Sequence, residues 1–180
     1  TRMPGIAAEK VKLSATEKDA LLFELGKELR KIHSANQKLF EESGLFPRDG
    51  SADLTERLQL RYGAAIQKKK DGISSEKLAF ALCEVETTLQ YIHDTDEFVA
   101  LHANPYIPHV FVDEATHKYS GIIDFGDAYI GHPIFDMWYW KAESRKKLLR
   151  GYTSEKPVSA AFLIIFDTVN EISRIIDKLR

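Results

Sequence analysis

The hydrophobic pattern of the chain changes its period near residue 97, and this change constrains the fold more than any other feature. Upstream, apolar residues recur at the three- and four-residue spacing of helices with one buried face. Downstream, short runs rich in β-branched and aromatic residues cover 98–101, 110–112 and 119–123. The polar connection between the last two runs has hairpin length. The sequence therefore predicts an α+β fold that is predominantly α-helical, with an inserted β-hairpin.

Capping signals and prolines indicate where the helices begin. Ser14 and Glu17 fit a capping box, in which a hydroxyl and a carboxylate accept hydrogen bonds from free amide groups at a helix start. Pro133 and Pro157 stand at expected first-turn positions of two later helices, and 35–50 reads as a loop. Three apolar stripes predict the upstream helices, which run over about 14–34, over about 52–70 and onward from Ser74 or Ser75.

The composition excludes several classes of protein. With 180 residues, 44% of them hydrophobic, the chain is long enough to bury a core, and we expect 1–180 to form a single unit. A formal net charge of -2 gives no field for nucleic acid or for an anionic membrane, and the lysines at 68–70 suit a solvated helix end. The single Cys83 excludes an intrachain disulfide and is expected to be a small buried filler. No stretch approaches the roughly 20 apolar residues of a membrane span. We expect a reducing cytoplasm.

The residues that suit chemistry gather between 102 and 136. The stretch LHANPYIPHVFVD, residues 101–113, holds His102, Asn104 and His109 in a proline-stiffened loop. Asp124 and Asp127 follow the apolar run GII, so two carboxylates are expected at the mouth of a buried strand, where ionisation without a cation is costly. Mg²⁺ prefers such hard oxygen ligands together with water and substrate phosphates. The pattern therefore indicates a divalent metal site.

Simpler explanations exist for several of these residues. The DFGD segment also suits a turn whose aspartate caps a helix, and His109 suits a satisfied histidine in a hairpin. Asp136 is expected to accept hydrogen bonds from loop amides beneath the site, and His132 before Pro133 is expected to serve the turn. The remaining histidines are expected at the surface or at helix ends, namely His33, His93 and His117.

The stretches LHANPYIPHVFVD and YSGIIDFGDAYIGHPIFD together resemble the catalytic core of the aminoglycoside phosphotransferase family, which are small-molecule kinases with a protein-kinase-like fold. That family carries H-x-D-x-x-x-x-N, then a hairpin, then I-D-F-G-D and D-P-x-x-D. The segment RMPG is similar to its interlobe hinge. The resemblance implies a kinase-like C-terminal lobe, with the N-terminal nucleotide-binding lobe absent from this chain. The residues in register are His102, His109, Asp124, Phe125, Gly126, Asp127, Pro133 and Asp136.

The resemblance implies a role for each matched polar residue. Asp124 would hold Mg²⁺ against the nucleotide phosphates, and His109 would give a second metal or phosphate contact where the family usually has Asn. His102 would brace the loop, while Asp127 and Asp136 would support it. The implied cofactors are Mg²⁺ and ATP or GTP as phosphate donor. The implied partner is a small molecule with a hydroxyl, such as an amino sugar.

Asn104 occupies the position of the family's catalytic aspartate. An amide can orient a substrate hydroxyl, but it cannot accept its proton near neutral pH. The chain also contains neither a Gly-rich loop nor a strand with an ATP-anchoring lysine, and His132 replaces the commoner Asp before Pro133. Because of these departures from the family pattern, we expect phosphoryl transfer to be impaired.

Three functions remain open at this point. The first is a Mg²⁺-dependent phosphotransferase, and the second is a catalytically inactive pseudokinase that binds without turnover. The third is a metal-dependent hydrolase with a zinc site formed by His102, His109 and Asp124. Two roles are open for a group of acidic residues, which could attract a polyamine substrate or could only solvate a helix face. These residues are Glu84, Glu86, Asp94, Asp96 and Glu97.

Overall fold

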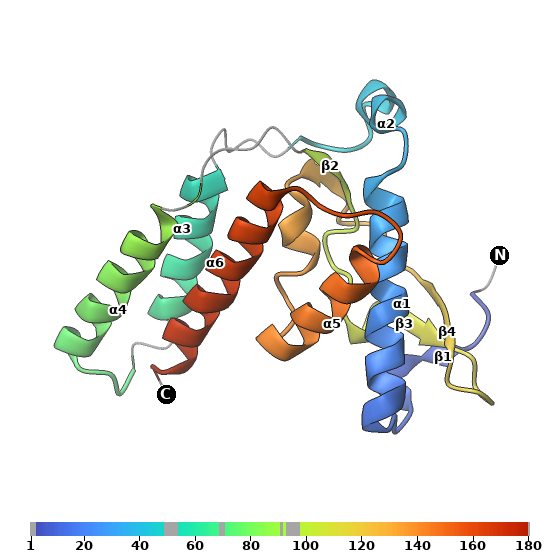
Figure 1. Ribbon diagram of the computed structural model, residues 1–180, viewed down its shortest axis with the longest axis horizontal. Coiled ribbons are helices and arrows are strands. Elements are labelled where there is room, and N and C mark those ends of the chain that lie inside the picture. Colours follow the sequence, from blue (N-terminus) through green and yellow to red (C-terminus); the bar gives the residue numbers. More distant parts are fainter. Residues whose placement is uncertain (1–2, 49–53, 69–70, 91, 93–97, 180) are drawn as a thin grey trace. The chain divides into compact units, whose positions relative to one another are not determined.

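The computed structural model describes residues 3–48, 54–68, 71–90, 92 and 98–179 (Figure 1). The chain divides into two compact units. The first, called the mixed part, comprises Thr1–Asp49 and Glu97–Pro157, and the second, called the helical part, comprises Gly50–Asp96 and Val158–Arg180. Whether the two parts form one structural unit, as the sequence led us to expect for 1–180, stays a prediction.

The mixed part contains two small antiparallel sheets. Strands β1, β3 and β4 form one in the order β1-β3-β4, and β2 pairs with β5 in the other. The β3–β4 pair is the predicted hairpin, with Val110 opposite Ile122. The strands are β1 (Ile6–Ala7), β2 (Val99–Leu101), β3 (Val110–Val112), β4 (Tyr119–Ile122) and β5 (Tyr129–Gly131). The helices are η1 (Ala8–Lys10), α1 (Ala15–His33), α2 (Gln37–Ser43), η2 (Ile107–His109), η3 (Pro133–Asp136) and α5 (Ala142–Tyr152).

Helix α1 begins at the predicted capping box. The Ser14 hydroxyl accepts a hydrogen bond from the Glu17 amide at 3.2 Å, and the Glu17 carboxylate accepts one from the Ser14 amide at 2.7 Å. Together with a bond from His117, these contacts lower the pKa of Glu17 to about 2. The buried stripe of α1 consists of Leu21, Leu22, Leu25, Gly26, Leu29 and His33.

Helices α1 and α5 pack directly against each other in the mixed part (Figure 1). A methyl group at Gly26 of α1 would overlap the backbone carbonyl of Leu148, and one at Gly151 of α5 would overlap that of Phe23. Each helix therefore presents a glycine where the other's backbone passes, and the close approach requires that neither residue has a side chain.

The helical part consists of α3 (Leu54–Gln67), α4 (Ser75–Leu89) and α6 (Ala160–Asp177), and α6 contacts both of the others (Figure 1). The Tyr62 hydroxyl donates a hydrogen bond to the Val169 carbonyl at 3.2 Å. Ser74 caps α4 as predicted, and Ser159 caps α6. The residues that form the centre of this core are Leu58, Tyr62, Ile66, Val85, Leu89, Phe162, Ile165, Val169 and Ile172.

The α+β, mainly helical fold class is confirmed, but several local predictions were wrong. The segment 35–50 is not all loop, because α2 lies within it and ends at Gly44 in the left-handed conformation. Pro133 opens only the short η3, and Pro157 precedes the Ser159 cap of α6 instead of opening the helix. Cys83 is exposed and not a buried filler, because Ala81, Val85 and Leu89 form the buried face of α4. No helix in the described part of the chain is long and apolar enough to cross a bilayer.

The glycine contact between α1 and α5 predicts a large effect of a single methyl group. We expect Gly26→Ala and Gly151→Ala each to lower the free energy of unfolding by about 2–3 kcal/mol, because the helices must move apart. Gly63→Ala on α3 is the matched control, since no described neighbour lies within 4 Å of the added carbon, and it should stabilise by about 0.5–1 kcal/mol. Urea denaturation measures all three, and equal effects at the three positions would contradict the close-approach explanation.

Candidate active site

Two loops of the mixed part meet at the candidate site. One runs from the end of β2 to the start of β3 and carries His102, Asn104 and His109, and the other follows β4 and carries Asp124. The Ile123 amide donates to the His109 carbonyl at 3.0 Å, and the His102 ring donates to the Ile123 carbonyl at 2.9 Å. These bonds tie the loops together, so the structure brings together His102, Asn104, His109 and Asp124.

His102 is completely buried, and both of its ring nitrogens are engaged. Nε2 bonds the Ile123 carbonyl, so Nε2 carries the hydrogen, while Nδ1 accepts a bond from the Asn104 amide at 3.3 Å. Burial lowers the pKa of His102 and favours this neutral form. The Phe125 ring packs against it, with ring centroids 4.4 Å apart. His102 is therefore placed to brace the loop and has no nitrogen left for a metal.

His109 and Asp124 face each other across the site. His109 Nδ1 bonds the Asn104 carbonyl oxygen at 2.9 Å, and since that oxygen can only accept, Nδ1 carries a hydrogen. The other nitrogen, Nε2, lies 3.4 Å from Asp124 Oδ2. In the neutral ring Nε2 carries a lone pair and no hydrogen. Nε2 and the Asp124 carboxylate are then both hydrogen-bond acceptors, and at this distance they need a proton or a cation between them. The 3.4 Å separation therefore suits either a protonated His109 paired with Asp124 or, when the ring is neutral, two ligands of a divalent cation.

The Asp124 backbone supports the same conclusion. Its φ is 69°, in the left-handed region that residues other than glycine rarely adopt. The Asp124 side chain is 58% exposed, whereas that of His109 is 17% exposed. The carboxylate therefore stands at the open side of the pair, where a metal ion can keep water ligands as Mg²⁺ prefers.

Asn104 is held by its backbone while its side chain is left available. Its amide donates to His102 Nδ1, and its carbonyl accepts from His109 Nδ1. In the described part of the chain no hydrogen bond to its side-chain amide is found, and the residue is half-buried. Trp140 fixes the following turn by donating from Nε1 to the Pro105 carbonyl at 2.9 Å. The loop thus presents the residue 104 side chain from a fixed backbone.

Asp136 lies beneath this loop and is fully buried. Its two carboxylate oxygens accept hydrogen bonds from the backbone amides of His102, at 2.9 Å, and Ala103, at 2.7 Å. Ala103 has a φ of 71°, so the carboxylate holds a strained turn in place. These bonds to loop amides are the contacts that the sequence led us to expect of Asp136.

His33 supports Asp136 from below, and the sequence analysis missed it. His33 is the last residue of α1, as expected of a helix-end residue, but it is buried and not at the surface, and it bonds Asp136 through Nε2 at 2.9 Å. Its Nδ1 bonds the Tyr152 hydroxyl of α5, also at 2.9 Å. A signal for this burial was present, since His33 lies four residues after Leu29 on the apolar stripe of α1.

His132 serves the turn, as the sequence predicts. Its Nδ1 accepts a hydrogen bond from the Ile134 amide at 3.2 Å and so caps η3, the element that carries Asp136. Burial, with a smaller contribution from nearby His33, lowers the pKa of His132 to about 4.

The other predicted residues lie outside this arrangement. Asp127 is exposed, and no hydrogen bond of its carboxylate is found among the described residues, so its supporting role stays a prediction. His117 is half-buried and bonds Glu17 at 2.9 Å. No group of three metal-binding side chains occurs in the described ranges. The predictions for His93, Asp94, Asp96 and Glu97 concern residues outside the described part.

The chain matches the model of the phosphotransferase enzyme family over residues 1–153, and it belongs to that family. No curated protein sequence matches the chain significantly.

Solved structures of phosphotransferases share the fold. A macrolide 2'-phosphotransferase type I is 16% identical with a TM-score of 0.60, and the match covers 97% of this chain and 60% of that one. The GDP complex of an aminoglycoside 2'-phosphotransferase-IIIa is 15% identical with a TM-score of 0.62, over 99% and 62% of the two chains. An enzyme from Streptomyces rimosus in complex with ADP and streptomycin is 15% identical with a TM-score of 0.53, over 99% and 68%. The chain thus spans about 60% of the length of the first two structures.

The buried Asp136 carboxylate predicts a stability effect that a surface carboxylate would not show. Asp136→Asn turns one acceptor into a donor that faces N–H groups, so we expect it to lower the free energy of unfolding by about 3 kcal/mol. Asp167→Asn makes the same change at an exposed carboxylate of α6 and should stay within about 0.5 kcal/mol of the parent protein. Urea denaturation of both variants checks this, and similar values for the two would show that Asp136 does not anchor the loop.

The lowered pKa of His132 predicts a loss of stability in acid. The unfolded chain binds a proton at this side chain as pH falls through the ordinary pKa of 6.5, whereas the folded chain resists protonation until about pH 4. Stability should therefore be fully present above 6.5 and fall as pH drops, by about 2 kcal/mol from this group at pH 5. In His132→Asn, which keeps a capping acceptor but does not titrate, the difference in stability between pH 7 and pH 5 should shrink by about that amount. An unchanged difference would contradict the assignment.

Proposed function

We propose that the protein is the kinase-like catalytic lobe of a small-molecule phosphotransferase that transfers a phosphate from ATP or GTP to a hydroxyl group. The observation that carries this proposal is the His109–Asp124 pair, with Nε2 and Oδ2 3.4 Å apart, beside the available side chain of Asn104. Membership of the phosphotransferase family supports it, as does the fold shared with structures that hold GDP or ADP.

Asp124 and His109 are the residues that would hold Mg²⁺ in this proposal. The ion would supply neutralisation of the negative charge on the transferring phosphoryl group. The protein's own contribution is to keep the two ligands at a fixed separation, since His109 is oriented by the Asn104 carbonyl and Asp124 by the turn that follows β4. His102 and Asp136 hold the loop that carries them, as positioning residues.

Asn104 would face the acceptor hydroxyl. Its amide can accept or donate a hydrogen bond and so orient the hydroxyl, but it cannot take the proton. Positioning and charge neutralisation provide most of the rate enhancement in phosphoryl transfer, so weak turnover is compatible with this residue. We propose that activity is impaired relative to a protein with aspartate at this position.

The acceptor that we propose is a small molecule with a hydroxyl, and amino sugars are the first candidates because one solved relative holds streptomycin. A nucleotide-binding lobe outside this chain would complete the donor site, in keeping with the 60% coverage of the macrolide enzyme. Since the chain has one cysteine, a reducing cytoplasm is the compartment that we propose.

A second candidate function is a binding module without turnover, and Asn104 is the observation that favours it. The zinc hydrolase has less support, because both nitrogens of His102 are engaged in hydrogen bonds and only His109 and Asp124 are left as ligands. A catalytic zinc site needs three protein ligands.

Replacing Asn104 with aspartate tests the proposed phosphotransferase activity. In the protein that includes the nucleotide-binding lobe, we expect Asn104→Asp to raise turnover by about 100-fold, because a general base then receives the hydroxyl proton. Nucleotide consumption with Mg²⁺ and a panel of amino sugars and other alcohols measures this. Adding Asp124→Asn to that variant should remove the gain, whereas Asp167→Asn, at an exposed position on α6, should leave it.

The possible outcomes separate the three functions. A gain that depends on Asp124 supports the phosphotransferase. Bound nucleotide or amino sugar with no gain from Asn104→Asp would instead establish the binding module. Hydrolysis that needs zinc and no nucleotide would overturn both.

A further inference from the structure

Two tyrosines beside the candidate active site leave their rings in contact with water. Tyr106 belongs to the loop between β2 and β3 and is 40% exposed, and Tyr139 follows η3 and is 55% exposed. Their ring centroids lie 6.4 Å apart, with an angle of 33° between the ring planes. In the described part of the chain neither hydroxyl forms a hydrogen bond. The two rings form a neighbouring pair of apolar faces, which we call the aromatic surface.

Tyr106 is fixed by its backbone to the residues of the candidate site. Its amide donates a hydrogen bond to the Asn104 carbonyl at 3.0 Å, and its carbonyl accepts one from the His109 amide at 2.9 Å. The Tyr106 and His109 rings are also in contact, with centroids 5.2 Å apart, as in stable aromatic pairs. The position of Tyr106 relative to Asn104 and His109 is therefore set before any ligand binds.

Tyr139 is held beside Tyr106 through its neighbour in the chain. Trp140 donates from Nε1 to the Pro105 carbonyl at 2.9 Å, so the residues next to the two tyrosines are bonded to each other. The Trp140 amide also closes a turn on the carbonyl of the buried Met137, at 3.3 Å. The aromatic surface is thus preformed, and a ligand that covers it does not have to order it first.

The aromatic surface begins close to the side chain that would face the acceptor hydroxyl. Tyr106 follows Asn104 by two residues, so their Cα atoms are at most about 7 Å apart. A ligand whose ring covers Tyr106 can therefore place a hydroxyl at Asn104 only when that hydroxyl is on the ring or on a short side chain of it. The two tyrosine rings carry no charge, so they favour the apolar face of another ring, by release of water and by ring–ring contact.

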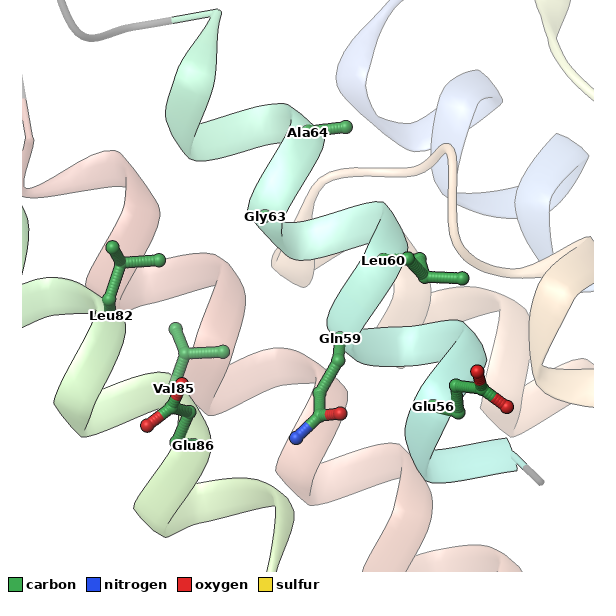
Figure 2. Close-up of a pocket in the computed structure, with 8 residues that line it drawn as sticks. All are labelled: Glu56, Gln59, Leu60, Gly63, Ala64, Leu82, Val85 and Glu86. Atoms are coloured by element: carbon green, nitrogen blue, oxygen red, sulfur yellow. The ribbon is translucent and has the colours of Figure 1, made fainter.

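Two cavities outside the candidate site do not define a ligand. Figure 2 shows the groove of about 550 Å³ between α3 and α4, and among its lining residues no buried side-chain polar atom is left without a partner. The cavity of about 510 Å³ at the start of α1 is lined by charges of both signs, which offset one another. These charged or titratable residues are Glu17, Glu24, His117 and Lys118.

We propose that the aromatic surface determines which acceptor is phosphorylated, and that this acceptor is an alcohol with a flat apolar ring close to its hydroxyl. The inference rests on the proposed phosphotransferase function. The ring covers Tyr106 and Tyr139 while the hydroxyl lies at Asn104. The bond from the terminal phosphorus of the nucleotide to its bridging oxygen breaks, a bond from that phosphorus to the acceptor oxygen forms, and the hydroxyl proton passes to water. An amino sugar, which has no flat apolar ring, is the poorer acceptor.

Binding of alcohols with and without a ring tests the aromatic surface without turnover. In the protein that includes the nucleotide-binding lobe, phenethyl alcohol is expected to bind at least about tenfold more tightly than ethanol or glucosamine. Titrations followed by backbone amide shifts in NMR spectra give the affinities. The shifts should concentrate on 104–109 and 137–140.

The kinetic test uses the Asn104→Asp protein with phenethyl alcohol as acceptor. Adding Tyr106→Leu and Tyr139→Leu should raise KM about tenfold and change kcat less than about threefold, since the rings bind the acceptor equally in the ground state and the transition state. Phenylalanine at both positions keeps the rings and should hold KM within about twofold of the Asn104→Asp protein. Phe80→Leu, the loss of a ring that is 63% exposed on α4, is the matched control and should also stay within about twofold.

The unfolding midpoint shows whether the leucine variants are folded. Because both tyrosines are exposed, we expect a midpoint close to that of the Asn104→Asp protein. Tyr139→Leu alone, at the more exposed position, keeps the test available if the double variant unfolds, and it should raise KM about threefold.

Several results would overturn the inference. Equal binding of phenethyl alcohol and ethanol, or amide shifts away from 104–109 and 137–140, would show that the aromatic surface does not bind a ring. An unchanged KM in the folded leucine variants would show that the two rings do not select the acceptor. A fall in kcat with KM unchanged would show that Tyr106 acts only on the position of His109.

The outcome for the proposed function is separate. Ring-dependent binding at the aromatic surface with no phosphate transfer to any alcohol would overturn the phosphotransferase and support a ring-binding site. Equally efficient transfer to phenethyl alcohol, ethanol and glucosamine would support the phosphotransferase and overturn the selection by Tyr106 and Tyr139.

Discussion

The Asp136 carboxylate lies out of contact with water, and three N–H groups converge on it, two from the loop at 102–103 and one from His33. Burying a carboxylate without these partners would destabilise the folded protein by several kcal/mol. The loop therefore cannot move away from Asp136 without that loss of stability. The strained backbone at Ala103 persists because this carboxylate holds both neighbouring amides. The position of the loop at His102 and Ala103 depends on this one group.

A series of short bonds carries that fixed geometry to the open side of the site. His102 bonds Ile123, the Asn104 carbonyl orients His109, and His109 is left with one nitrogen directed at Asp124. Each step leaves fewer free hydrogen-bonding groups, until His109 Nε2 and the Asp124 carboxylate remain opposite each other. The metal affinity that we propose is therefore a consequence of how the ring is held from behind, as well as of the two ligands themselves.

Local signals predicted much of the fold, and long-range contacts account for what was missed. The capping box of α1, the Ser74 cap and the β3–β4 hairpin depend on neighbours in the chain, so they could be read from the sequence. The role of His33 depends on Asp136 and Tyr152, more than a hundred residues away, although its place on the α1 stripe was visible. Helix α2 was missed because Gly44 and Pro47 suggested a loop. In a sequence, a glycine that ends a short helix cannot be told from a glycine within a turn. The candidate site itself was predictable because its residues fall within two short stretches of sequence.

The close crossing of α1 and α5 fixes the distance between side chains that support the candidate site. Gly151 directly precedes Tyr152, whose hydroxyl bonds His33, and Gly26 lies two turns before His33 on α1. The backbone contact therefore acts as a spacer, since the two side chains can meet only while the helices stay this close. A substitution at this crossing can thus alter the loop without touching Asn104, His109 or Asp124.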